Sequence, residues 1–152
     1  MMVRFISLIS RHSKNMDPLK YPSADRVIEY NALALAVIQV KKKDRPQVLN
    51  KTAIIHVIKD CTDLRGDVYD KAVVLLVGLV KKHPFSSGNR RTAMIVAKDF
   101  LESNKSRLGV SDDPSQARAL LGVREGFYST EEIKEWLKHG KICEFKKMKL
   151  QD

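Results

Sequence analysis

The sequence is poor in the residues that mark several special classes of protein. Its 152 residues include seven Gly, five Pro and two Cys. So few Gly and Pro exclude collagen-like and proline-rich chains. Cys61 and Cys143 form neither a CxxC pair nor a disulfide framework. This cysteine usage fits a reducing cytosol and leaves a single bridge between the two open.

Long hydrophobic stretches are missing as well. The longest apolar run, residues 72–80, is far shorter than the ~20 residues that span a bilayer. The opening MMVRFISLIS contains a short apolar patch but no small-residue cleavage site. We therefore expect no membrane span and no secretory signal, and we expect the protein to be cytoplasmic.

The charge, in contrast, is strongly one-sided. Lys and Arg total 28 against 18 Asp and Glu, which gives a formal net charge of +10. Such an excess favours a nucleic acid, a nucleotide or an acidic protein as the partner. The hydrophobic fraction of 43% is ordinary for a folded domain and argues against a disordered chain.

Helical periodicity runs through residues 21–140, which we expect to form one all-α domain of about six helices. Residues 1–20 would be an N-terminal tail or extension, and residues 141–152 a basic C-terminal tail. Cap residues and apolar spacing predict helices that begin at Ser23 and near Asn89, and helices over residues 50–61, 67–82, 114–121 and 129–139. Gly122 is expected to end the helix over residues 114–121, and Gly140 the helix over residues 129–139.

The segment 67–82 decides the fold class. Its apolar run, AVVLLVGLV, is compatible with a buried strand. Its length of about 16 residues, its acidic start at Asp67 and Asp70 and its basic end at Lys81 and Lys82 instead fit a helix whose charges complement its dipole. Because it is apolar on nearly every side, we predict that this helix lies at the centre of the core.

An unusual turn joins this helix to the next. Pro84 ends the first helix, and the cap and turn residues Ser-Ser-Gly-Asn follow at 86–89. The next helix opens with Arg90 and Arg91, although cations at a helix N-terminus are unfavourable by about 0.3–1 kcal/mol each. Lys81 and Lys82, just before the turn, add to the positive charge.

Such a cluster makes sense if an anion binds there. Free backbone N–H groups, a glycine turn and two guanidinium groups together form a phosphate-binding site. His83 stands at its edge, where an imidazole can transfer a proton. The alternative interpretation is a solvated basic turn with an ordinary histidine.

The nonapeptide HPFSSGNRR at positions 83–91 resembles the Fic/Doc signature, H-x-F-x-[D/E]-[G/A]-N-[G/K]-R. The matching positions are His83, Phe85, Gly88, Asn89 and Arg91. The preceding YDKAVVLLVGLVKK and the later GVREGFYSTEEIKEWL resemble the same family in its Doc (death-on-curing) branch. The resemblance covers roughly residues 20–140 and implies an all-α domain.

In this family the motif transfers part of a nucleotide, most often AMP from ATP, to a protein hydroxyl. The Doc branch is described as a toxin that phosphorylates a translation elongation factor and is neutralised by a small antitoxin. The resemblance implies that His83 is the general base, that Phe85 anchors the loop and that Arg91 stabilises charge on the transferred group. It also implies nucleotide and phosphate binding by Ser86, Ser87, Gly88, Asn89, Arg90 and Arg91.

The implied co-substrate is a nucleoside triphosphate, with ATP the first choice. The implied partners are a target protein carrying a Ser, Thr or Tyr hydroxyl, with a translation factor as one candidate, and a small antitoxin. Arg90 fills a position that is Gly in Fic and Lys in Doc, and Met94 stands where Fic proteins have a second arginine. Both features favour the Doc branch.

One departure bears on the metal. The acidic residue that normally holds Mg²⁺ is Ser87 in this chain, and a hydroxyl is a poor substitute for a carboxylate on a hard cation. The use of Mg²⁺ is therefore left open, and no metal-ligating residue is predicted.

Two alternatives stay open. The chain could be a degenerate member in which Ser87 has abolished catalysis and which binds a nucleotide or a partner. It could also be a basic nucleic-acid-binding domain with an accidental motif, although no recognition signature supports this. The remaining candidates, His12, His56 and His139, lack metal-ligand spacing, and Lys41–Lys43 is interpreted as a solvated connection.

Overall fold

A computed structural model describes residues 18–37 and 45–146. These ranges contain six α-helices and no strand, which confirms the prediction of an all-α bundle. The helices are α2 (Ala24–Val37), α3 (Lys51–Asp63), α4 (Val68–Lys82), α5 (Asn89–Ser103), α6 (Pro114–Arg124) and α7 (Thr130–His139). None of them is long and apolar enough to cross a membrane.

Side-chain caps start the helices where the sequence predicts them. The Asn50 carboxamide accepts a hydrogen bond from the N–H of Ala53 at the start of α3. Asp67 at α4 and Ser129 at α7 each form a capping box with the residue three positions later. Because such caps satisfy N–H groups that the helix itself leaves free, they set the first residue of each helix.

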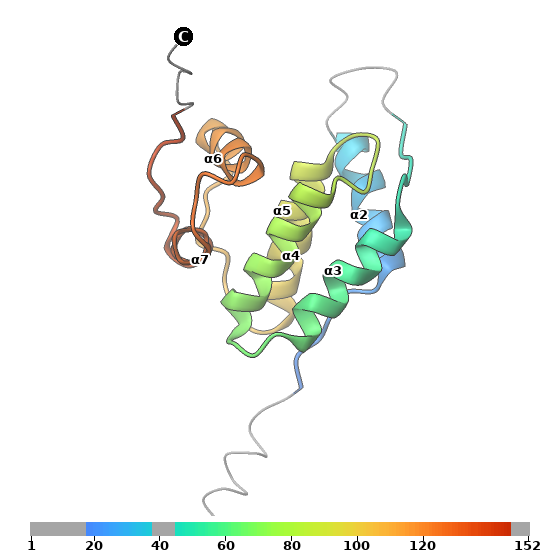
Figure 1. Ribbon diagram of the computed structural model, residues 1–152, viewed down its shortest axis with the longest axis horizontal. Coiled ribbons are helices and arrows are strands. Elements are labelled where there is room, and N and C mark those ends of the chain that lie inside the picture. Colours follow the sequence, from blue (N-terminus) through green and yellow to red (C-terminus); the bar gives the residue numbers. More distant parts are fainter. Residues whose placement is uncertain (1–17, 38–44, 147–152) are drawn as a thin grey trace, which may run out of the picture.

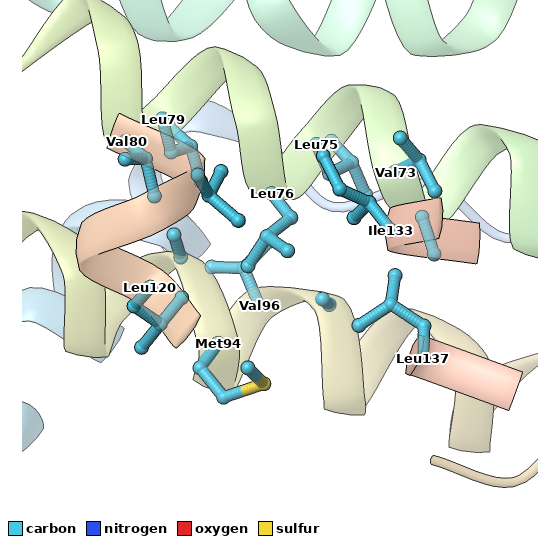
Figure 2. Packing of buried hydrophobic residues seen from close by; sticks show 14 of the residues in the cluster. Val73, Leu75, Leu76, Leu79, Val80, Met94, Val96, Leu120, Ile133 and Leu137 are labelled. Carbon is cyan, nitrogen blue, oxygen red and sulfur yellow. The ribbon is translucent and has the colours of Figure 1, made fainter. Parts of the chain in front are cut away.

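The predicted central helix is central in the structure. α4 packs against α3, α5, α6 and α7, with α3 on one side of it and α6 and α7 on the other (Figure 1). Its Leu75, Leu76 and Leu79 are at most 1% exposed and meet apolar side chains of α5, α6 and α7 (Figure 2). Burial of such a side chain stabilises a fold by about 1.5–3 kcal/mol, so α4 fixes the positions of its neighbours.

One expectation about helix α6 is wrong. α6 continues past Gly122 to Arg124. Gly122 is buried within the helix, where an added methyl group would overlap the ring of Tyr128, so this glycine permits close packing instead of ending the helix.

Segments outside the helices also join the core. Tyr21 stacks on Phe100 of α5, with ring centroids 5.9 Å apart. After α7, Phe145 is buried, and the carbonyl of Cys143 accepts a hydrogen bond of 2.7 Å from the Tyr128 hydroxyl. Residues 1–17 and 147–152, which make up most of the two expected tails, and the lysines 41–43 lie outside the described residues.

The buried ammonium group of Lys71 closes the C-terminal end of α3. Its Nζ donates hydrogen bonds to the carbonyls of Cys61, Thr62 and Leu64 at 2.9, 3.1 and 2.7 Å. Carbonyls in the last turn of a helix have no partner within the helix, and a cation there complements the helix dipole. Lys71 of α4 therefore ties α3 to the central helix.

We expect Lys71→Met to lower the free energy of unfolding by about 2–3 kcal/mol, because three carbonyls, one of them in a buried hydrogen bond and two in partly buried ones, lose a charged donor. Denaturation with urea, followed by circular dichroism, measures this change. Lys59→Met is the matched control: Lys59 pairs with Asp63 on the exposed side of α3, at 2.8 Å. Equal midpoints for the two variants would contradict the role given to Lys71.

Candidate functional site

The loop between α4 and α5 has a backbone that few residues tolerate. His83 follows α4 as its C-terminal cap residue, and its φ of 51° lies in the left-handed region. Gly88, immediately before α5, has a φ of 75°. Between them, Phe85 is 1% exposed and anchors the loop in the core, as the resemblance implies. The loop therefore reverses the chain within a few residues and holds His83 at the surface.

The side chain of Asn89 holds this loop together from within. Its Oδ1 accepts a hydrogen bond of 2.9 Å from the Phe85 N–H, and its Nδ2 donates one of 2.8 Å to the Phe85 carbonyl. Asn89 is 5% exposed, so both bonds are shielded from water. The amide side chain is thus engaged within the loop, and the contact with phosphate predicted for Asn89 falls to its backbone N–H at the start of α5.

A stretch of extended backbone before α3 supports the loop from one side. The N–H groups of Leu49 and Asn50 both donate to the carbonyl of Pro84, at 2.8 and 3.1 Å. The N–H of Ser86 donates in return to the carbonyl of Gln47 at 3.0 Å. Val48 and Phe85 form an isolated antiparallel bridge at this point.

Helix α2 supports the loop from another side, through a residue that the sequence reasoning missed. The Nδ2 of Asn31, which is 1% exposed, donates to the Ser87 carbonyl at 2.9 Å and to the Thr92 hydroxyl at 3.1 Å. A lone asparagine on the inward face of an amphipathic helix is the one local signal that could have drawn attention to it. Nothing in the sequence indicates that its partners lie more than 50 residues away.

The predicted site residues share one cavity. It has a volume of about 680 Å³, and its lining includes His83 and all of residues 86–91. The opposite wall comes from the segment before α6 and from α6 itself, with Asp112, Gln116 and Arg124. The part that α6 takes in the cavity could not be predicted, because no local pattern brings residues 112–124 to a loop some 30 residues earlier.

The lining of the cavity carries charges of both signs. Arg90, Arg91 and Arg124 supply guanidinium groups, while Asp112 and Asp113 supply carboxylates. The Asp113 carboxylate accepts hydrogen bonds from the Ser115 hydroxyl and backbone N–H, and these lower its pKa. The carboxylate of Asp113 is therefore engaged in capping α6. Of the two carboxylates, that of Asp112 is the one left to contact a ligand in the cavity.

The N-terminus of α5 differs from the other helix starts. Side-chain oxygens accept hydrogen bonds from N–H groups at the starts of α2, α3, α4, α6 and α7. α5 starts at Gly88 with no side-chain cap, and this end of the helix opens into the cavity. Its N–H groups and dipole are thus available to an anion.

Lys81 and Lys82 do not take part in the cavity. Their place in the sequence predicts that they add to the positive charge of the turn, but both lie in the exposed last turn of α4 and neither lines the cavity. The reason is that the chain reverses at His83, after these two lysines. The basic character of the cavity comes from Arg90, Arg91 and Arg124.

The side chains that line the cavity do not by themselves form a metal-binding site. Ser87 stands in the cavity where the motif has an acid, and the described residues contain no group of three or more His, Cys, Asp or Glu side chains that could hold a metal. A single exposed carboxylate, that of Asp112, is a weak site for Mg²⁺, which prefers several oxygen ligands. These residues do not fit a protein-held Mg²⁺ site, so we derive no step through the metal.

The other candidate residues lie away from the cavity. His56 and His139 are exposed, and His139 faces Glu135 at 3.8 Å within α7. His12 is outside the described residues. Both cysteines are free thiols, and burial raises the pKa of the Cys61 thiol to about 11, which keeps it protonated and unreactive.

Comparison with known proteins confirms the family resemblance of the sequence. The sequence profile of the Fic/DOC family matches residues 20–101, more than half of the chain, and this match spans α2 to α4, the loop and most of α5. It does not extend to α6 and α7, which the resemblance had included. The comparison with curated proteins finds no match. The fold, the loop and the profile match together show that the chain belongs to the Fic/DOC family.

Proposed function

We propose that this protein is a Fic/DOC-type transferase that moves a phosphoryl or nucleotidyl (AMP-like) group from a nucleoside triphosphate to a protein hydroxyl. One observation carries the proposal: His83, the uncapped start of α5 and the pair Arg90 and Arg91 all line the same cavity. A base, an anion-binding helix end and two guanidinium groups are the parts that phosphoryl transfer needs. ATP is the co-substrate that we favour.

The cavity suggests how the triphosphate binds. Its phosphates would lie against the N–H groups of Gly88 and Asn89, with the side chains of Ser86 and Ser87 as additional donors. Arg90 and Arg91 are exposed and would neutralise the charge that develops on the transferred group and the leaving group. The size of about 680 Å³ leaves room for a nucleoside beside the phosphates.

The reaction then needs one proton transfer and one displacement. The imidazole of His83 takes the proton from a Ser, Thr or Tyr hydroxyl of the target, and the oxygen attacks phosphorus. Attack at the α-phosphorus breaks the bond to the β-phosphate oxygen and releases pyrophosphate. Attack at the γ-phosphorus breaks the corresponding bond and releases ADP. Catalysis comes mainly from positioning and charge stabilisation in either case.

The biological role that we propose is that of a cytoplasmic toxin in a toxin–antitoxin pair, with a translation factor as a candidate target. Residues 21–140 would be the helical catalytic domain, flanked by segments 1–20 and 141–152. The net charge of +10 would suit a small acidic antitoxin. This role rests on the Doc-like Arg90 and Met94 of the motif region.

Ser87 favours a second candidate function. With a hydroxyl in place of the motif acid, the chain would keep the fold and the anion site but transfer no group. Such a degenerate member would act as a nucleotide-binding or protein-interaction module.

Incubation of the protein with cell extract and ATP labelled at the α- or the γ-phosphate tests the proposal. We expect label on a protein band, from the α-phosphate for nucleotidyl transfer and from the γ-phosphate for phosphorylation. His83→Ala and His83→Gly should both abolish the label, because each removes the base. Purified protein that binds ATP but labels nothing would favour the second candidate function.

The same two variants separate catalysis from folding. Because residue 83 has a left-handed backbone, His83→Gly should be more stable to unfolding than His83→Ala by about 1 kcal/mol. Thermal unfolding of both variants measures the difference. A label that returned in the more stable glycine variant would show that the loss came from unfolding and would overturn the role of His83 as base.

Ser87→Asp restores the acid of the motif and tests the metal. We expect ATP binding by this variant to become dependent on Mg²⁺, with an affinity at least about tenfold higher with the metal than with a chelator. Isothermal titration calorimetry measures both affinities, and Ser86→Asp, one position earlier in the loop, is the matched control. Equal Mg²⁺ dependence in the two variants would contradict a specific role for position 87.

A further inference from the structure

We propose that Asn31 of α2 is a positioning residue that fixes the orientation of the Ser87–Gly88 peptide in the phosphate-binding loop. This inference rests on the proposed function, because it assigns a purpose to a contact of that same site. Asn31 lies outside the motif and does not line the cavity. Its role would be to hold the loop in the form that accepts an anion.

The contacts of Asn31 are specific and shielded. The side chain is 1% exposed and gives both of its hydrogen bonds to α5 and the loop: 2.9 Å to the Ser87 carbonyl and 3.1 Å to the Thr92 hydroxyl. A buried carboxamide that lost these partners would cost about 1–3 kcal/mol. The two acceptors bracket Gly88 and the first turn of α5, so Asn31 spans the start of this helix.

The contact between Asn31 and the Ser87 carbonyl also determines the direction of the Gly88 N–H. The structure describes no cis peptide, and in a trans peptide the C=O and the following N–H point in opposite directions. Because the Ser87 carbonyl points to Asn31, the Gly88 N–H points away from α2. α2 contributes no residue to the cavity lining, whereas Ser87 and Gly88 both do. The contact thus keeps a donor, and not a carbonyl oxygen, on the side where phosphate would bind.

Glycine at position 88 makes this constraint necessary. With its φ of 75°, Gly88 occupies a region that only glycine enters freely, and glycine also permits the rotated peptide. α2 lies close on this side: a Cβ at Gly88 would come within 3.1 Å of Leu35 Cδ2 and 3.3 Å of Asn31 Nδ2. Without the hydrogen bond from Asn31, rotation of the peptide would direct a carbonyl oxygen toward the anion and repel it.

Two variants isolate this role. Asn31→Ala frees the Ser87 carbonyl, whereas the matched control Thr92→Val removes only the other acceptor and leaves Asn31 bonded to Ser87. If Asn31→Ala does not fold, Asn31→Ser, whose hydroxyl is too short to reach Ser87, takes its place. Thermal unfolding records the stability that each variant loses.

The first readout is amide hydrogen exchange, which needs no activity. The N–H groups of Phe85 and Ser86 are bonded within the loop, to Asn89 and Gln47. We expect them to exchange at least about tenfold faster in Asn31→Ala than in Thr92→Val. Each variant is measured at the same number of degrees below its own melting temperature. Equal exchange in the two variants would overturn the proposal, because Asn31 would then be a merely structural residue.

The second readout is ATP binding and its kinetic consequence. We expect Asn31→Ala to weaken ATP binding, and to raise KM for ATP, by about tenfold to a hundredfold, while Thr92→Val stays within about twofold of the wild type. Unchanged ATP affinity in Asn31→Ala would also overturn the proposal. Faster loop exchange in a protein that transfers no label from ATP would instead refute the proposed function and leave the positioning role of Asn31 standing.

Discussion

The reciprocal pair of hydrogen bonds between the Asn89 side chain and the Phe85 backbone is the interaction on which the site depends. It closes the loop between α4 and α5 on itself, at 2.9 and 2.8 Å, in surroundings shielded from water. Because the carboxamide replaces backbone partners that this turn lacks, the chain can reverse without leaving buried groups unsatisfied. The same turn puts His83 at the surface, Phe85 in the core and the uncapped end of α5 in the cavity. Loss of the pair would therefore disturb the positions of His83, Phe85 and the start of α5 together.

The rest of the fold serves to hold this turn in place. α4 packs against α3, α5, α6 and α7, and its buried leucines meet apolar side chains of α5, α6 and α7 (Figure 2). The segment that precedes α3 then reaches the loop through Gln47, Leu49 and Asn50, and α2 reaches it through Asn31. α6 closes the cavity on the far side with Gln116 and Arg124. A loop that is held from several sides before a ligand arrives loses little entropy on binding, which is how preorganised electrostatic sites gain their effect.

Most of the helices, and the motif itself, could be predicted from the sequence, because they depend on local patterns. The capping residues Asp67 and Ser129 and the apolar spacing within α5 determine helix positions within a few neighbouring residues. Long-range features could not be predicted. The pairing of Asn31 with Ser87 and the contribution of Arg124 to the cavity depend on helix packing, which no local pattern encodes. The same reason explains the wrong prediction at Gly122. The sequence predicts that this glycine ends α6, but it lies within the helix because Tyr128 packs closely against it.

We propose that the loop and the start of α5 form a phosphate-binding site before any ligand arrives. Titration of the ¹⁵N-labelled protein with ATP, followed by amide resonances in NMR spectra, tests this proposal. We expect saturable shifts that are largest for the N–H groups of residues 88–90, with Phe85 and Ser86 keeping their protection from exchange. Shifts without saturation, scattered over exposed lysines such as Lys59 and Lys82, would contradict it.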